Sequence, residues 1–165
     1  MFALRVLARR YQALSAELAC LSEELDRRTR TAAPRLVARF GIGPDSAGAL
    51  LVAAGDNPGR LRSDACFAML CGASPIPASS GKTTRHRLNR GGDRQANRAL
   101  HLAVISRIRL DPRTQTYVAK KTAEGHSKME IIRCLKRYLA REVYFILNPG
   151  LQHIIPNTKQ HRNAA

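Results

Sequence analysis

The sequence predicts an all-α protein. Apolar residues recur three and four positions apart along most of the chain, which is helical spacing, and helix start signals stand between these stretches. No stretch shows the alternation of apolar and polar residues that is typical of a strand. We expect a long N-terminal helix of the coiled-coil kind, followed by a small helical domain that contains a helix-hairpin-helix-like motif and a basic loop.

The N-terminal helix is expected over residues 3–30, which contain neither Gly nor Pro, and Pro34 marks its end. A narrow apolar seam is typical of a coiled coil, whereas an amphipathic helix packed on its own domain is the alternative. The spacings of the seam alternate between three and four: Leu4, Leu7, Tyr11, Leu14, Leu18, Leu21 and Leu25. We assign residues 1–32 to a coiled-coil connector helix that joins copies of the chain in a homo-oligomer.

A tight turn between two short helices is expected at Gly41-Ile42-Gly43, because Pro44 suits the first position of a second helix. Two glycines that flank an apolar residue match a helix-hairpin-helix loop, in which the free N–H groups of the second helix grip a phosphate. Gly41 and Gly43 are therefore candidate nucleic-acid-binding residues. A turn with no ligand is the alternative.

Three further helices are expected, and each has a start signal of its own. Asp93 and Asp111 are N-cap residues, and Ser127 and Glu130 form a capping box. The helices that follow are expected to end near residues 110, 123 and 147. Residues 33–148 then make up one helical domain, and residues 149–165 form a basic, flexible tail.

The charge of the chain predicts a polyanionic partner. Lys and Arg number 28 against 12 Asp and Glu, which gives a net charge of +16. Such an excess is typical of nucleic-acid-binding proteins, although a ribosome-associated protein would share it. No run of 18 apolar residues occurs, so no membrane span is expected.

The cysteines predict no metal site. They form no C-x-x-C pair, and the five histidines do not cluster with them. Reduced, mostly buried thiols in a cytoplasmic protein are the expectation. The cysteines are Cys20, Cys66, Cys71 and Cys134.

Residues 71–92, which we call the basic loop, form the longest stretch without helical spacing. The loop contains the letters G-K-T but is no P-loop, because Ile76 stands where the first Gly is required and no apolar strand precedes it. Ser79 and Ser80 stand before Gly81, and Asn89, Gln95 and Asn97 add neutral donors. Six cations follow the serines in the loop and the next helix: Lys82, Arg85, Arg87, Arg90, Arg94 and Arg98.

This arrangement is suited to contacts with several phosphates, and a solvated basic loop is the alternative. A serine hydroxyl beside a glycine is easily presented, but as a nucleophile it needs a base, a metal or strong positive charge. His86 and the arginines are suited to stabilise a pentacoordinate phosphoryl transition state.

Three segments, in order, resemble the C-terminal transposase domain of the insertion-sequence-110 family, which is also grouped with 116 and 902. The segments are F-G-I-G-P-D-S-A-G-A-L-L-V-A-A-G-D, C-F-A-M-L-C-G-A-S-P and S-S-G-K-T-T-R-H-R-L-N-R-G-G-D-R-Q-A-N-R-A-L. The resemblance implies a prokaryotic, nucleoid-associated DNA transposase or site-specific recombinase. It implies Ser80 as the nucleophile, with Ser79 as the alternative, and DNA and a noncoding guide RNA as partners.

Members of that family carry a resolvase-like domain whose four acidic residues bind Mg²⁺, ahead of a coiled coil. This chain begins at Met1 in what resembles the coiled coil, and its acidic residues are scattered. We therefore expect a truncated transposase that binds nucleic acid but is inactive alone. A non-enzymatic helix-hairpin-helix nucleic-acid-binding protein is the alternative function.

Overall fold

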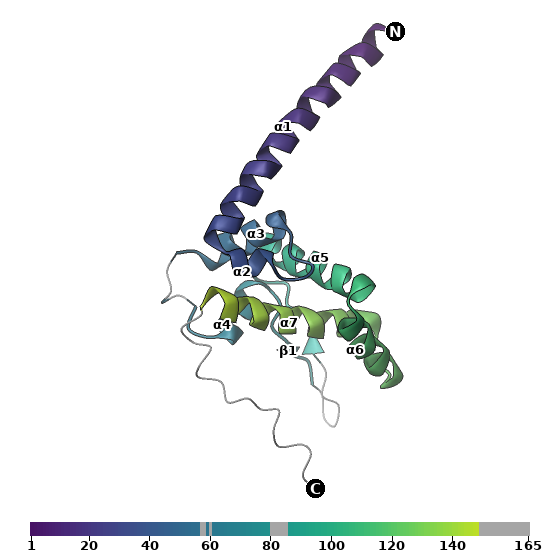
Figure 1. The fold of residues 1–165 in the computed structure, drawn as a ribbon. Coiled ribbons are helices and arrows are strands. Elements are labelled where there is room, and N and C mark those ends of the chain that lie inside the picture. The colour runs from purple at the N-terminus through teal and green to yellow at the C-terminus, as the bar shows by residue number, and fades with distance from the viewer. Residues whose placement is uncertain (57–58, 60, 80–85, 149–165) are drawn as a thin grey trace.

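The computed structural model describes residues 1–56, 59, 61–79 and 86–148 (Figure 1), and these residues are predominantly helical, as expected. The elements are α1 (Phe2–Ala32), α2 (Pro34–Val37), α3 (Pro44–Ala54), α4 (Asp64–Leu70), β1 (Ile76–Pro77), β2 (His86–Arg87), α5 (Arg94–Leu110), α6 (Pro112–Ala123) and α7 (Lys128–Leu147). None of the helices in these ranges is both long and apolar enough to cross a membrane. The predicted tail, residues 149–165, lies outside the described residues.

The predicted helix starts are confirmed. Asp93 accepts a hydrogen bond from the backbone N–H of Ala96 (2.7 Å) at the start of α5. Asp111 caps α6, and Ser127 and Glu130 form the predicted capping box of α7. These caps satisfy N–H groups that have no partner within their own helix, so the local sequence determines where each helix begins.

The sequence did not predict the two strands. β1 and β2 pair antiparallel, with Ile76 opposite Arg87 and Pro77 opposite His86. Each strand has only two residues, which is too short for an alternating pattern, and the proline cannot donate a ladder hydrogen bond. This short ladder joins the two sides of the basic loop.

Figure 1 shows that α1 extends away from the other helices, and its C-terminal end lies against α2 and α3. There Thr29 is buried, and a Cβ placed on Gly48 of α3 would lie 3.3 Å from Cδ1 of Leu25. The seam residues from Leu4 to Leu21 are exposed instead, with Leu21 67% accessible. The chain's own domain therefore does not bury this part of the seam, and the coiled coil stays a prediction.

The hydrophobic core lies where α3 and α7 pack on α5 and where α4 packs on α7. Small residues on α5, among them Ala96, Ala99 and Ala103, let neighbouring backbones approach it closely. The largest fully buried side chains come from several helices: Leu36, Leu50, Phe67, Leu100, Val104, Leu139 and Val143.

The expectation of mostly buried thiols is wrong. Only Cys71 is buried among the four cysteines, and all four are free thiols. Cys20 lies on the part of α1 that no other element covers, and Cys66 and Cys134 lie on exposed faces of α4 and α7. Burial raises the pKa of the Cys71 thiol to about 12, so this thiol stays protonated.

The two ends of the basic loop meet. Gly72 and Gly92 both have positive φ, and the N–H of Asp93 donates to the carbonyl oxygen of Leu70 (2.6 Å). A Cβ placed on Gly92 would lie 2.5 Å from the carbonyl oxygen of Leu70 and 2.6 Å from the nitrogen of Gly72. Backbone atoms cannot give way as a flexible side chain can, so glycine is required at this crossing.

We predict that Gly92→Ala destabilises the protein far more than Gly125→Ala. Both glycines have positive φ, but nothing lies within 4 Å of a Cβ placed on Gly125. The control therefore measures backbone strain alone, about 1–2 kcal/mol, while Gly92→Ala adds a backbone clash and is expected to cost about 4 kcal/mol or more. Urea unfolding followed by circular dichroism measures both values. Equal costs would show that the loop ends do not meet this closely.

Candidate nucleic-acid interface

The Gly41-Ile42-Gly43 turn packs on α5. Ile42 is buried, and a Cβ placed on Gly41 would lie 2.8 Å from the carbonyl oxygen of Ala103. Gly41 also has positive φ, so the close packing and the backbone conformation together account for this glycine without a ligand. Gly43 is the exposed N-cap of α3, and Asp45 follows it in the first turn. A carboxylate there stabilises the helix N-terminus but repels a phosphate, so phosphate binding by the turn stays a prediction.

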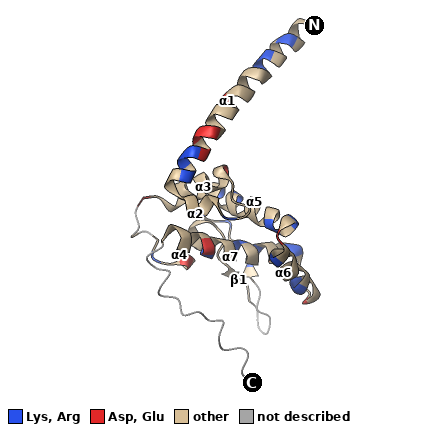
Figure 2. Cartoon of the chain, in the orientation of Figure 1, with Lys and Arg blue, Asp and Glu red and all other residues tan. Residues whose placement is uncertain are grey.

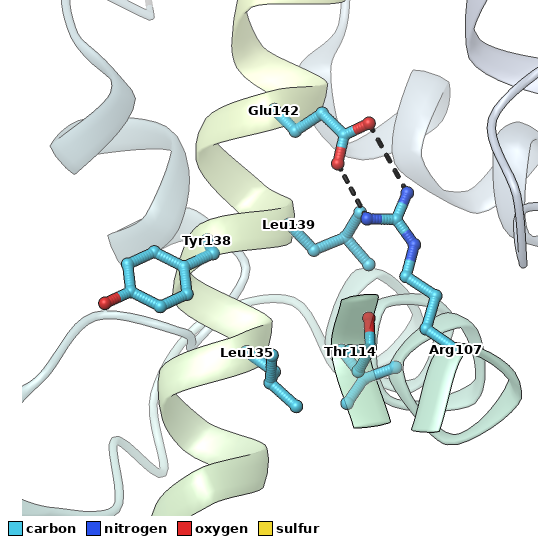
Figure 3. Close-up of a pocket in the computed structure, with 7 residues that line it drawn as sticks. Arg107, Thr114, Leu135, Tyr138, Leu139 and Glu142 are labelled. Carbon is cyan, nitrogen blue, oxygen red and sulfur yellow. Dashed lines mark hydrogen bonds and ion pairs between the residues drawn. The ribbon is translucent and has the colours of Figure 1, made fainter. Parts of the chain in front are cut away.

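An ion pair connects this turn with the two longest helices of the domain. Nε of Arg107 donates to the carbonyl oxygen of Phe40 (2.9 Å), and the guanidinium binds both carboxylate oxygens of Glu142 on α7 (2.7 and 3.4 Å; Figure 3). The cavity beside this pair, about 60 Å³, is lined by residues of α5, α6 and α7. It is too small for a nucleotide, so we assign the Arg107–Glu142 pair a structural role.

The basic loop exposes several of the predicted binding residues. Ser79, Arg87, Arg90, Arg94 and Arg98 are exposed, and within the described part of the chain none of these arginines pairs with a carboxylate. The remaining predicted residues of this group, Ser80, Lys82 and Arg85, lie outside the described residues. Figure 2 shows that α5 and α6 also bear Lys and Arg, and neither helix contains Asp or Glu.

Two of the three expected neutral donors have internal partners instead. Asn97 donates to the carbonyl oxygens of Cys71 (2.8 Å) and Gly72 (3.1 Å). Asn89 donates to Oγ of Ser74 (3.1 Å) and accepts from the N–H of Gly91 (3.0 Å). Their prediction as nucleic-acid donors is therefore wrong, because these amides hold the loop in shape. Gln95 is exposed.

Sequence reasoning missed a larger cavity of about 320 Å³ between the basic loop and α7. We call it the α7 pocket. The loop contributes His86, Arg87 and Leu88 to the α7 pocket, among other residues. The segment that includes α7 contributes His126, Glu130, Arg133, Cys134, Lys136, Arg137 and Tyr138. The pocket thus combines cations with an aromatic ring and aliphatic side chains.

Lys136 is the least expected residue of the α7 pocket. It is only 6% exposed, and its Nζ donates to Oδ1 of Asn97 (2.6 Å). It forms no ion pair within the described residues, and burial lowers the pKa of its ammonium group. One sequence signal could have revealed it, since Lys136 stands at core spacing between Ile132 and Leu139.

Arg137 enters the α7 pocket in a fixed position. Its guanidinium lies 2.8 Å from Oδ2 of Asp64 on α4, and both side chains are partly buried. Asp64 also lies 3.8 Å from Nε of Arg141. The ion pair attaches α4 to α7 and limits the conformations of Arg137.

No group of three His, Cys, Asp or Glu side chains suited to a metal ion occurs within the described ranges. Several carboxylates of the described residues are engaged elsewhere: Asp93 and Asp111 cap helices, and Asp64 and Glu142 pair with arginines. The described residues therefore do not fit the Mg²⁺ that the family resemblance implies.

We predict that Asn97→Ala destabilises the protein by about 3 kcal/mol, because it leaves the buried Lys136 ammonium and two loop carbonyls without their partner. Gln95→Ala on the exposed face of α5 is the control, with an expected cost of less than about 0.5 kcal/mol. Thermal and urea unfolding check both values. A cost for Asn97→Ala as small as that of the control would contradict the anchoring role of the amide.

Comparison with known proteins identifies the family. Residues 33–119 match the sequence model of the transposase IS116/IS110/IS902 family. The chain is 30% identical over 118 residues to the insertion element IS110 uncharacterized 43.6 kDa protein of Streptomyces coelicolor, covering 71% of this chain and 29% of that protein. It is 30% identical over 135 residues to the insertion element IS900 uncharacterized 42 kDa protein of Mycobacterium paratuberculosis, covering 79% and 34%. The chain thus spans about a third of the length of these curated relatives. The family match covers more than half of the residues, and the chain belongs to the IS116/IS110/IS902 transposase family.

Proposed function

We propose that this chain acts as the C-terminal domain of a DNA transposase or site-specific recombinase. In this role it binds DNA and a noncoding guide RNA, and it supplies a serine nucleophile for strand cleavage and transfer. Family membership carries the proposal. The exposed arginines of the basic loop and α5 support it, because cations that have no carboxylate partner among the described residues are suited to bind phosphates.

The proposed chemistry is a phosphoryl transfer to serine. The Oγ of Ser80 forms a bond to phosphorus and its proton passes to solvent, the bond from phosphorus to a sugar oxygen breaks, and the displaced oxygen takes up a proton. Ser79 is the alternative nucleophile. Arg87 and Arg90 would stabilise the charge on the phosphoryl oxygens. We propose that the Mg²⁺ of the active assembly is held by carboxylates other than those described here, so that the chain alone is inactive.

We predict that Ser80→Ala abolishes covalent capture of DNA. A tagged copy of this 18.2 kDa chain is mixed with a full-length family member, its guide RNA, its DNA substrate and Mg²⁺. The tagged chain should form an adduct with labelled DNA that survives denaturing electrophoresis. Ser80→Ala should lose the adduct because the attacking oxygen is gone, while noncovalent DNA binding changes less than about twofold. Ser79→Ala is the matched control and should retain the adduct.

The opposite pattern, with capture lost only in Ser79→Ala, would show that the nucleophile is Ser79. Equal capture in both variants would exclude a serine nucleophile from this pair. Such a result would favour a non-enzymatic nucleic-acid-binding role, provided that the chain still binds DNA.

We also propose that α1 pairs with α1 of a second copy in a coiled coil. The observation that supports this is the seam from Leu4 to Leu21, whose side chains are exposed in the described part of the chain. Apolar residues at this spacing gain free energy when a second helix buries them.

We predict that Leu14→Asp combined with Leu18→Asp yields a monomer at concentrations where the parent chain is a dimer, because two carboxylates per helix would be buried in the seam. The control, Ala13→Asp with Ala16→Asp, adds the same charge to exposed α1 positions outside the seam and should remain dimeric. Analytical ultracentrifugation measures both. A parent chain that is already monomeric at micromolar concentration would exclude pairing through α1.

A further inference from the structure

We infer that the α7 pocket binds one unstacked nucleotide of a DNA strand. The inference rests on the nucleic-acid binding proposed above, but not on the serine chemistry. The pocket volume, about 320 Å³, is in the range of pockets that hold small organic ligands. The pocket opens beside the loop that carries Ser79, so a nucleotide bound there would belong to a strand that also contacts the loop.

The charge of the pocket selects an anion. Among the described residues, four cationic side chains line it, Arg87, Arg133, Lys136 and Arg137, against one carboxylate, Glu130. The charge of Arg137 is paired with Asp64, which leaves three cations against Glu130. That carboxylate accepts hydrogen bonds from the N–H (2.8 Å) and the hydroxyl (2.7 Å) of Ser127, so it is engaged in the helix cap. An excess of cations in a partly enclosed site attracts a phosphate group more strongly than the same charges on an open surface.

Two of these cations are held in place before any ligand arrives. Asn97 holds the Lys136 ammonium, and Asp64 holds the Arg137 guanidinium. The partner of Lys136 is a neutral amide, so the lysine charge is not cancelled where it lies. A bound phosphate would supply the missing negative charge at a low cost in side-chain ordering.

The rest of the lining is suited to a nucleobase. Tyr138 is 57% exposed, and its ring packs edge-on against Tyr117 with centroids 5.9 Å apart, which fixes its orientation. Leu88 is 49% exposed, and Pro75 adds a further apolar surface. A free inorganic phosphate would leave these surfaces uncovered, whereas a base would stack on the aromatic ring.

The test uses the full chain and a short single-stranded DNA that carries one 5-iododeoxyuridine, a base that photocross-links to aromatic side chains in contact with it. Mass spectrometry of the cross-linked peptide should identify Tyr138. Fluorescence anisotropy should show that Tyr138→Ala weakens binding about tenfold, the loss of one stacked base. Phe2→Ala is the matched control, since Phe2 is an exposed aromatic residue on α1 outside the seam, and it should bind like the parent.

The cations of the pocket are tested in the same assay. Lys136→Met and Arg133→Met should each weaken binding about fivefold to tenfold, and Lys120→Met, an exposed lysine on α6, less than twofold. Circular dichroism verifies that each variant is folded. If the buried Lys136→Met variant is unfolded, Arg133→Met and Tyr138→Ala decide the result.

The outcomes separate this inference from the proposed function. Cross-linking at Tyr138 with no serine capture would support the pocket and contradict the nucleophile. DNA binding that is unaffected by the pocket variants, with cross-links elsewhere, would overturn the inference alone. Displacement of the DNA by an equal concentration of a free nucleoside monophosphate, or cross-linking only to RNA of the same sequence, would overturn its assignment to a DNA strand. No binding to any nucleic acid would overturn both.

Discussion

The arrangement of the candidate site depends on the hydrogen bonds of one side-chain amide, that of Asn97. From α5 it donates to the carbonyl oxygens of Cys71 and Gly72, where the basic loop begins, and it accepts from the ammonium group of Lys136 on α7. One residue thus connects both sides of the α7 pocket with a core helix. The crossing of Gly72 and Gly92 lies directly beside it, since a Cβ on Gly72 would lie 2.9 Å from Nδ2 of Asn97. The loop is therefore fixed at its base.

This anchoring has an electrostatic consequence. A buried ammonium group normally pairs with a carboxylate, because removing a charge from water is costly. Lys136 instead has an amide partner, so part of that cost remains in the isolated chain. A polyanion bound in the pocket would offset this burial cost of the Lys136 ammonium. Binding would then be more favourable than the attraction of the surface charges alone would make it. The arginines of the loop act differently, because they are exposed and screened by salt. We therefore expect two parts to binding, a salt-sensitive attraction to the loop and a less salt-sensitive contact in the pocket.

The sequence predicted the features that depend on near neighbours. Asp93, Asp111 and the Ser127–Glu130 box act on N–H groups within three residues, so their effect can be read from a short stretch. The α7 pocket depends on contacts between residues far apart in the chain, since Asn97 bonds to carbonyls 25 and 26 positions earlier and to a lysine 39 positions later. No local pattern specifies such partners. Asn97 was therefore expected to be a free donor, and Lys136 was not singled out.

The helix α1 and the domain it joins differ in what stabilises them. The end of α1 that packs on α3 is stabilised by burial of Thr29 and contact with Leu25. In the same stretch, Glu24 pairs with Arg27 and Arg28, and Asp26 pairs with Arg30, at spacings that stabilise a helix without tertiary contacts. Forming the first turn of a helix is unfavourable, and the packed, ion-paired end of α1 provides that turn. Each further residue toward Met1 then adds one backbone hydrogen bond. The seam is thus already helical before a partner arrives, and less ordering entropy is lost when two copies associate.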